Sequence, residues 1–365
     1  MIVLEGEYSV GNNMYPPLIV DRKDPKWLLL EQILTITTSR RTRQELAKHG
    51  ITPVMKAGTV LRTVLISMFF FVEVAYVVEE LRKRRGLRTF AHIAEVPSAD
   101  EVYRFLSRFD EDRFVSLVSG VLNSLCTHTR RRKPGTILVD STAITLDLNW
   151  FRRRFTKVQL MARDFDWGYS PVHGHYIGYK LTMAVDYPSL QPLAILLHRG
   201  SPHDSPLFEE ILKELKRRRI TRPGDLVICD KGYYSYQNYV DGIIDFRIVP
   251  LIFSKKNFNE KKLLNRLSFP LSVFGRSDTR ERVRLFKRLV RKLIDGLAHQ
   301  DSYQAIRSLI EDVFKLAKDA FSLKKFHRYT TRSVKKAVCL NVLLVGLVVS
   351  LGFRSKKQLQ RLAEW

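Results

Sequence analysis

Three acidic residues stand in contexts that suit metal-dependent phosphoryl transfer. Asp140 and Asp230 each follow a short apolar run, TILV at 136–139 and LVIC at 226–229. If both runs are strands of one sheet that end at these acids, we expect the two carboxylates to meet beyond the strand ends. Neighbouring carboxylates repel each other unless a cation lies between them, and their hard oxygens suit Mg²⁺ or Mn²⁺. Two such ions can activate an attacking hydroxyl and stabilise the leaving oxygen at phosphorus.

A third acid would complete this metal site, and the predicted helix at 302–322 offers one. Glu311 shares a helical face with Arg307, four residues before it, and with Lys318, seven residues after it. An ordinary row of surface ion pairs has the same spacing, so the pattern by itself leaves both interpretations open. Asp312, about 100° further around the helix, is the alternative acid.

The segment that contains these acids reads as a mixed α/β core. Apolar runs typical of strands occur at five places, which are 136–140, 179–187, 192–200, 225–230 and 246–252. Helical patterns follow the third and the fourth of them, at 205–219 and 235–243. Three meandering strands followed by crossover units is the order of the ribonuclease-H-like fold. We therefore predict a ribonuclease-H-like core with a mixed five-stranded sheet.

The regions on either side of this core differ from it. Residues 26–128 show helical periodicity, and a Pro- and Gly-containing basic joint, RRRKPG, follows at 130–135. Within the helical part, 41–65 resembles a helix-turn-helix, although short helix pairs are also common scaffolding. The predicted organisation is a helical region for DNA binding or assembly, a catalytic domain with a basic insertion at about 253–300, and a basic tail, at 1–130, 131–345 and 346–365.

The charge of the chain points to a polyanionic partner. The chain has 62 Lys and Arg against 37 Asp and Glu, a net charge of +25, and such a field favours nucleic acid. Residues 247–300 alone carry 14 basic and four acidic side chains. The run RERVRLFKRLVRK at 280–292 predicts an amphipathic helix, which either contacts phosphates or only faces solvent.

Cysteine usage and hydropathy indicate the compartment. Cys126, Cys229 and Cys339 are far apart and form no zinc-finger or disulfide spacing. The amino terminus lacks the pattern of a signal peptide. Two apolar stretches, 63–72 and 337–353, are shorter than the roughly 20 residues of a membrane span, so we predict buried core helices. We expect a cytoplasmic protein without membrane contact.

Several other residues are weaker candidates for function. Lys231 follows Asp230 and could approach a phosphate, but a solvated lysine fits equally well. His173 and His175 lack a clear third metal ligand, so they are expected on a strand surface or at DNA. A basic cluster in the connection 141–175 is a candidate for DNA backbone contacts: Arg152, Arg153 and Arg154. Three aromatic residues are expected to pack rather than to stack on bases: Tyr233, Tyr234 and Tyr236.

Four motifs occur in order along the chain. They are VDST at 139–142, GSPHDSPLF at 200–208, VICDKGYYS at 227–235 and YQAIRSLIEDVFKLAK at 303–318. Together they resemble insertion-sequence transposases of the Asp-Asp-Glu class, and within that class the insertion-sequence-four/five superfamily. The resemblance covers residues 135–345 and extends more loosely over the helical region before them.

The resemblance implies roles for individual residues. Asp140 and Asp230 match the first and second metal ligands of the family, and Glu311 matches the third. Arg307 and Lys318 match the Arg and Lys of the family's helical Tyr-Arg-Glu-Lys pattern, and with Lys231 and Tyr303 they are the expected DNA contacts. Tyr303 stands four residues before the Arg, where the family has three. The His-Asp-Ser at 203–205 matches a recurrent element without a settled role.

The resemblance also implies an activity and its partners. We expect cleavage and strand transfer of insertion-sequence ends with two Mg²⁺ or Mn²⁺ ions. The partners would be DNA with terminal inverted repeats, target DNA, and a second copy of the chain in a homo-oligomer such as a dimer. A ribonuclease-H-like nuclease and a non-catalytic DNA-binding protein are the alternative functions.

Overall fold

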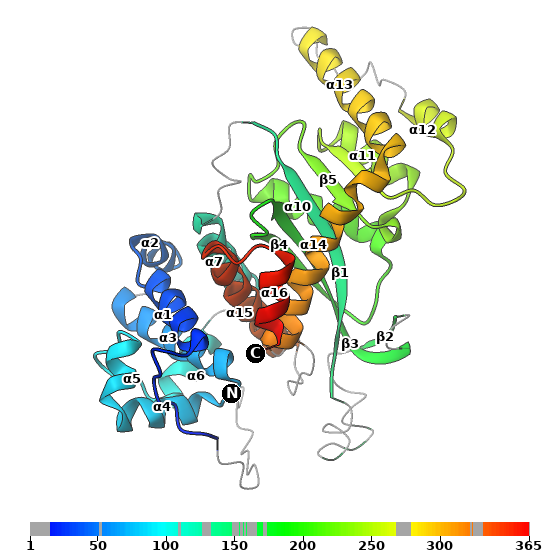
Figure 1. Ribbon diagram of the computed structural model, residues 1–365. Helices are drawn as coiled ribbons and strands as arrows, with labels where there is room; N and C mark the ends of the chain where they lie inside the picture. Colours follow the sequence, from blue (N-terminus) through cyan, green and yellow to red (C-terminus); the bar gives the residue numbers. More distant parts are fainter. Residues whose placement is uncertain are drawn as a thin grey trace.

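The computed structural model describes most of the chain (Figure 1). The described residues are 15–50, 53–108, 111–125, 133–147, 153, 156, 158, 166–170, 174–267, 279–321, 323 and 331–364. Four residues considered above lie outside them, namely Cys126, Arg152, Arg154 and His173.

The amino-terminal region is helical, as predicted. Its described elements are α1 (Pro25–Thr37), α2 (Arg40–Lys48), α3 (Val54–Phe70), α4 (Val74–Lys83), α5 (Arg85–Phe90), α6 (Ala99–Ser107) and α7 (Glu111–Leu125). The predicted start of α6 is confirmed, because the Ser98 hydroxyl accepts a hydrogen bond from the Glu101 N–H and the Glu101 carboxylate accepts one from the Ser98 N–H.

Helix α3 is a core element. Between Ala57 and Phe69 all its residues are buried except the half-buried Thr59 and Met68. A recognition helix must offer an exposed face to the major groove. Beyond Met55 and Lys56 in its first turn, α3 offers no such face, so the helix-turn-helix interpretation of 41–65 gains no support from the structure. Most of the apolar stretch 63–72 lies in this buried helix, as predicted.

The region after residue 133 contains a mixed sheet with the predicted order of strands. The strands are β1 (Thr136–Thr145), β2 (Asp166–Ser170), β3 (Gly174–Tyr187), β4 (Pro192–Arg199), β5 (Leu226–Cys229) and β6 (Val249–Ile252). Antiparallel β4, β3 and β1 lie beside parallel β5 and β6. This is a ribonuclease-H-like sheet with one strand more than predicted, because β2 pairs with the early part of β3.

Strand β1 is longer than its apolar run. It continues past Asp140 to Thr145 because it pairs with β3 as far as Gly178. Asp140 therefore lies within a strand, opposite Met183, and not at the strand end that the hydropathy pattern predicted. Pairing with β3 extends β1 past the point where side-chain hydropathy predicts its end.

Helices cover the sheet and follow it. Helix α10 (Asp204–Arg217) contacts β3 and β4, whereas α11 (Tyr236–Ile244) and α13 (Thr279–Ala298) contact β6. The short helix α12 (Glu260–Arg266) precedes α13, so the described part of the basic insertion is mainly helical. Helix α14 (Gln304–Lys315) lies against β1 and ends in the π-turn η5 (Leu316–Ala320).

Helix α15 (Thr331–Ser350), near the end of the chain, connects the two regions (Figure 1). It contacts α1, α3 and α7 on one side and β4 on the other. A β-carbon at Gly346 would lie 2.1 Å from a Leu122 methyl group, so α15 and α7 approach too closely for any larger residue. By length and composition α15 alone could cross a membrane among the described helices, but 83% of its apolar window is buried within the protein.

The predicted carboxyl-terminal tail is structured. The proposed boundary at residue 345 lies inside α15, and 356–363 form α16 (Lys356–Ala363). This helix packs on α14 with Leu359 and Leu362 buried. A basic composition therefore did not prevent this segment from docking, because its leucines recur three residues apart on one face.

Candidate active site

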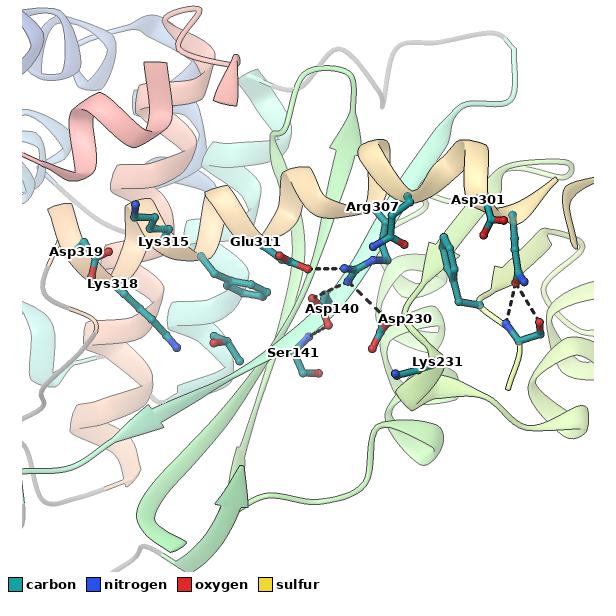
Figure 2. A pocket seen from close by; sticks show the side chains of 16 residues that line it. Asp140, Ser141, Asp230, Lys231, Asp301, Arg307, Glu311, Lys315, Lys318 and Asp319 are labelled. Carbon is teal, nitrogen blue, oxygen red and sulfur yellow. Dashed lines mark hydrogen bonds and ion pairs between the residues drawn. The ribbon is translucent and has the colours of Figure 1, made fainter. Parts of the chain in front are cut away.

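The predicted acids meet in one open pocket of about 880 Å³ between the sheet and α14 (Figure 2). Asp140, Asp230 and Glu311 line it, together with Arg307. They come from a strand, from the turn after a second strand and from a helix that is distant in sequence. These side chains meet only because the fold brings the three segments together.

Strand register explains why the two aspartates are neighbours. Val139 on β1 pairs with Cys229 on the parallel strand β5, so the following residues, Asp140 and Asp230, emerge side by side. The Asp140 side chain is 18% exposed and that of Asp230 is 38% exposed. The aspartate within the longer strand is therefore the more deeply set of the two.

A small hydrogen-bond network lies beneath Asp140. The Ser141 N–H donates to Asp140 Oδ1 at 2.8 Å, and the Ser141 hydroxyl lies 2.5 Å from the Tyr233 hydroxyl and 2.9 Å from that of Thr182. Tyr233 is completely buried, as the packing prediction for it requires. The network ties the turn after Asp230 to the strand of Asp140.

Burial dominates the electrostatics of Asp140. Loss of solvent raises the pKa of its carboxyl to about 7, and the neighbouring Asp230 carboxylate adds to this rise. The Ser141 N–H and the Arg307 guanidinium act in the opposite direction and lower the pKa. A cation beside this carboxyl would lower its pKa and stabilise the ionised form.

The Arg307 guanidinium lies among the three acids. Its Nη1 is 3.9 Å from Asp140 Oδ2 and 3.8 Å from Asp230 Oδ1, while Nη2 is 2.5 Å from Glu311 Oε1. The side chain is only 12% exposed, and its buried Nε has no hydrogen-bond partner among the described residues. Arg307 thus provides the positive charge that three converging carboxylates need.

The geometry separates Glu311 from its rival. Glu311 lines the pocket and its side chain is 54% exposed. Asp312 is buried on the side of α14 that faces α16, where Gln360 Nε2 lies 3.4 Å from its Oδ1. Burial raises the pKa of Asp312 as well. Of the two adjacent acids, only Glu311 shares a pocket with the aspartates.

The donor atoms suit a hard divalent cation, but they are not yet gathered around one point. Within the described residues, no three His, Cys, Asp or Glu side chains are grouped closely enough to hold a metal ion. Asp140 and Asp230 both lie within 4 Å of a single guanidinium nitrogen, so a cation does fit between those two. Glu311 is held by Arg307 instead.

The remaining predicted residues divide into two groups. Lys231 and Lys318 line the pocket, whereas Tyr303 does not line it and packs against the hydrophobic core. Among the described members of the weaker candidates, Arg153 is exposed and the His175 ring lies 5.2 Å from that of Tyr169.

Sequence reasoning missed part of the pocket wall. Gln300 accepts hydrogen bonds at its side-chain oxygen from the Ser254 N–H and hydroxyl, and thereby ties the start of α14 to the end of β6. Gln304 and Asp301 complete this end of the pocket. These are ordinary polar residues without a distinctive spacing, so no sequence signal marks them.

A comparison with known protein families identifies the family of the chain. Residues 131–347 match the family described as transposase DDE domain. No curated protein matches the chain significantly. The solved piggyBac transposase synaptic complex with hairpin DNA is 12% identical, with a TM-score of 0.40 over 95% of this chain and 80% of that one, and a similarity this low carries no argument. The family match covers more than half of the chain, which therefore belongs to the DDE-domain transposases.

Proposed function

We propose that the protein is a metal-dependent transposase of the insertion-sequence-four/five superfamily. In this proposal it cleaves the ends of an insertion sequence and joins them to target DNA, with Asp140, Asp230 and Glu311 as the ligands of two Mg²⁺ or Mn²⁺ ions. The observation that carries the proposal is the convergence of these acids on one cation, Arg307, in one pocket. We expect this reaction to take place in the cytoplasm.

The chemistry of the donors supports the proposed metal ligands. Asp140 and Asp230 offer hard oxygens on either side of a position that already attracts positive charge. When bound, the ions would activate the attacking hydroxyl or water and stabilise the leaving oxygen. Glu311 would join them once Arg307 turns away from it.

The chain's own cations would orient the DNA. Arg307 presents a planar fork that suits a phosphate when the ions take over its contacts with the acids. Lys231 and Lys318 line the same pocket. In this proposal they contact the phosphates of the DNA strand that is bound there. In this proposal Tyr303 holds the start of α14 in place and does not contact the DNA, because its ring packs against the core.

The basic insertion supports a DNA partner. Four exposed cations of α13 stand at helical spacing on one face, namely Arg280, Arg284, Lys287 and Arg291. On the packed side, Leu289 and Leu293 are buried, so the orientation of this stripe is fixed. A fixed cationic stripe gains affinity for a phosphate backbone by releasing counterions. The helix runs directly into η4 (Gln300–Tyr303) and α14, beside the pocket.

The test is cleavage and joining of DNA that carries the inverted repeats flanking the gene. With Mg²⁺ we expect nicked ends and joined products from the wild type, and losses on the order of 10³-fold for Asp140→Ala and Glu311→Ala. Asp312→Ala is the matched control on the same helix. If Asp140→Ala and Glu311→Ala both cleave and join DNA as well as the wild type, the assignment of these residues is wrong.

The same experiment separates the alternatives. End cleavage that never yields joined products, whatever target DNA is offered, would favour a nuclease. DNA binding that is indifferent to Mg²⁺ in the wild type and in Asp230→Asn would favour a non-catalytic binding protein.

A further inference from the structure

A second charged pair lies beside the proposed metal site. Lys180 on β3 and Asp204 at the start of α10 form an ion pair with 2.7 Å between Nζ and Oδ1. The Lys180 ammonium also donates to the Pro202 carbonyl at 2.8 Å. Their side chains are 11% and 27% exposed, so this pair is more enclosed than a surface salt bridge. Asp204 belongs to the His-Asp-Ser element whose role was open.

The Asp204 carboxylate lies against the turn that follows Asp230. This turn is the short helix η2 (Lys231–Tyr233), and a β-carbon at Gly232 would stand 2.8 Å from Asp204 Oδ2. Gly232 does not have a positive φ, so its effect here is one of space: an alanine would force the Asp204 carboxylate to shift. The carboxylate thus occupies the room that the missing side chain leaves.

A neighbouring amide reinforces the same junction. Asn238 on α11 is buried, and its side-chain N–H groups donate to the Ser205 carbonyl at 2.9 Å and to the Tyr233 carbonyl at 2.7 Å. It therefore links the start of α10 to the end of η2. Lys180 in turn lies on β3 opposite Ala143 of β1, the strand that carries Asp140.

We propose that Asp204 and Lys180 are a positioning pair that fixes the turn carrying Asp230 against the strand carrying Asp140. The inference rests on the proposed function, because it assigns the pair to the spacing of two proposed metal ligands. Such supporting contacts typically alter metal affinity or activity by about 10–100-fold when they are lost. The pair does not touch the reacting groups and is not itself catalytic.

The experiment uses the full chain with Asp204→Asn and Lys180→Met. Lys213→Met is the matched control, because Lys213 pairs with Glu209 at 2.8 Å on the exposed face of the same helix. We expect each test variant to bind DNA like the wild type, to need about 10-fold more Mg²⁺ for half-maximal cleavage, and to bind Mn²⁺ more weakly in the absence of DNA. The control should match the wild type in every assay.

A second variant tests the contact itself. Gly232→Ala should push the Asp204 carboxylate away and so weaken Mn²⁺ binding like Asp204→Asn. In an Asp204→Ala background the added methyl meets no carboxylate, so Gly232→Ala should cause no further loss. This dependence on residue 204 would not arise if Gly232 served only the fold.

Two results would overturn the inference. One is wild-type Mn²⁺ binding and Mg²⁺ dependence in both Asp204→Asn and Lys180→Met. The other is a loss of DNA binding and thermal stability in parallel with activity, which would mean that the pair supports the fold rather than the site. A wild type that cleaves no DNA would instead contradict the proposed function, and the Mn²⁺ measurements would still decide the role of the pair.

Discussion

Asp140 and Glu311 line the same pocket, yet the sheet and α14 hold them in different ways. The sheet places Asp140 in a paired strand, with the Ser141 N–H on its carboxylate and a buried tyrosine beneath. Glu311 stands on a helix with its side chain 54% exposed, and its carboxylate is held by Arg307 one turn away. The carboxylate of the sheet is held by the backbone beside it, whereas that of the helix is paired with the guanidinium of another side chain.

The difference has a physical basis. A strand within a sheet is fixed on both sides by backbone hydrogen bonds, so the position of its side chains depends little on their own contacts. A long side chain on an exposed helix face retains rotamer freedom and pays for any single geometry with conformational entropy. We expect the sheet side to provide the first metal position and the α14 side to close it.

The largest expected effect is a difference in metal binding between a variant on the sheet and a variant on α14. Asp230→Ala should abolish both Mn²⁺ binding and DNA cleavage, the latter on the order of 10³-fold. Glu311→Ala should lose as much cleavage but retain one Mn²⁺ site, because Asp140 and Asp230 remain. Calorimetry with Mn²⁺ alone measures the difference. Equal loss of metal in both variants would remove the distinction between sheet and helix.

A smaller effect should follow when the guanidinium of Arg307 is removed. Arg307→Met should bind Mn²⁺ at least about 10-fold more tightly without DNA, because a cation that competes for Asp140, Asp230 and Glu311 is lost. The same variant should cleave DNA more slowly, since the proposed phosphate contact is gone. Weaker Mn²⁺ binding would instead mean that Arg307 organises the acids and does not compete for them.

The burial of Asp140 predicts a dependence of stability on pH. Its pKa of about 7 in the folded protein exceeds the ordinary value of 3.8, so its protonated form stabilises the metal-free fold at low pH and this stability is lost as pH rises to about 7. Asp140→Asn mimics the neutral form. The stabilisation that it brings should be about 1 kcal/mol greater at pH 8 than at pH 6. Denaturant unfolding in the presence of a chelator measures it, and a gain independent of pH contradicts the prediction.

The smallest effect is expected from the neighbouring acid on α14. Asp312→Asn should change DNA cleavage and Mg²⁺ dependence by less than about 3-fold, because the side chain faces α16 and Gln360 rather than the pocket. Glu311→Gln, the matching change at the neighbouring acid, should not cleave DNA. A large loss of cleavage in Asp312→Asn at normal thermal stability would reverse the assignment of the third acid.

Much of the fold could be predicted because its signals are local. Hydrophobic periodicity identified the helical region before residue 128, five of the strands and their order. It missed β2, whose five residues, DWGYS, contain only two large apolar side chains and which pairs with the early part of β3. It also stopped β1 at Asp140, because pairing with β3 is not visible in one strand's sequence.

The candidate site could also be predicted only in part from the sequence. Asp140 and Asp230 could be named from apolar runs that end on an acid. Glu311 could be named only because its spacing to Arg307 and Lys318 resembles the pattern of a known family. The role of Arg307 among the acids, the burial that raises the pKa of Asp140 and the contact of Asp204 with Gly232 could not be predicted. Each of these depends on residues distant in sequence that meet only after folding.

The sequence by itself determined the chemical inventory of this protein: the acids, the basic surface and the order of strands and helices. Only the tertiary structure decided which of the two adjacent acids on α14 shares a pocket with the aspartates, since Glu311 and Asp312 differ by one residue and by which neighbour they face. Helix periodicity defines the faces of α14, but it contains no information about whether α16 or β1 covers each of them. That choice is made by packing.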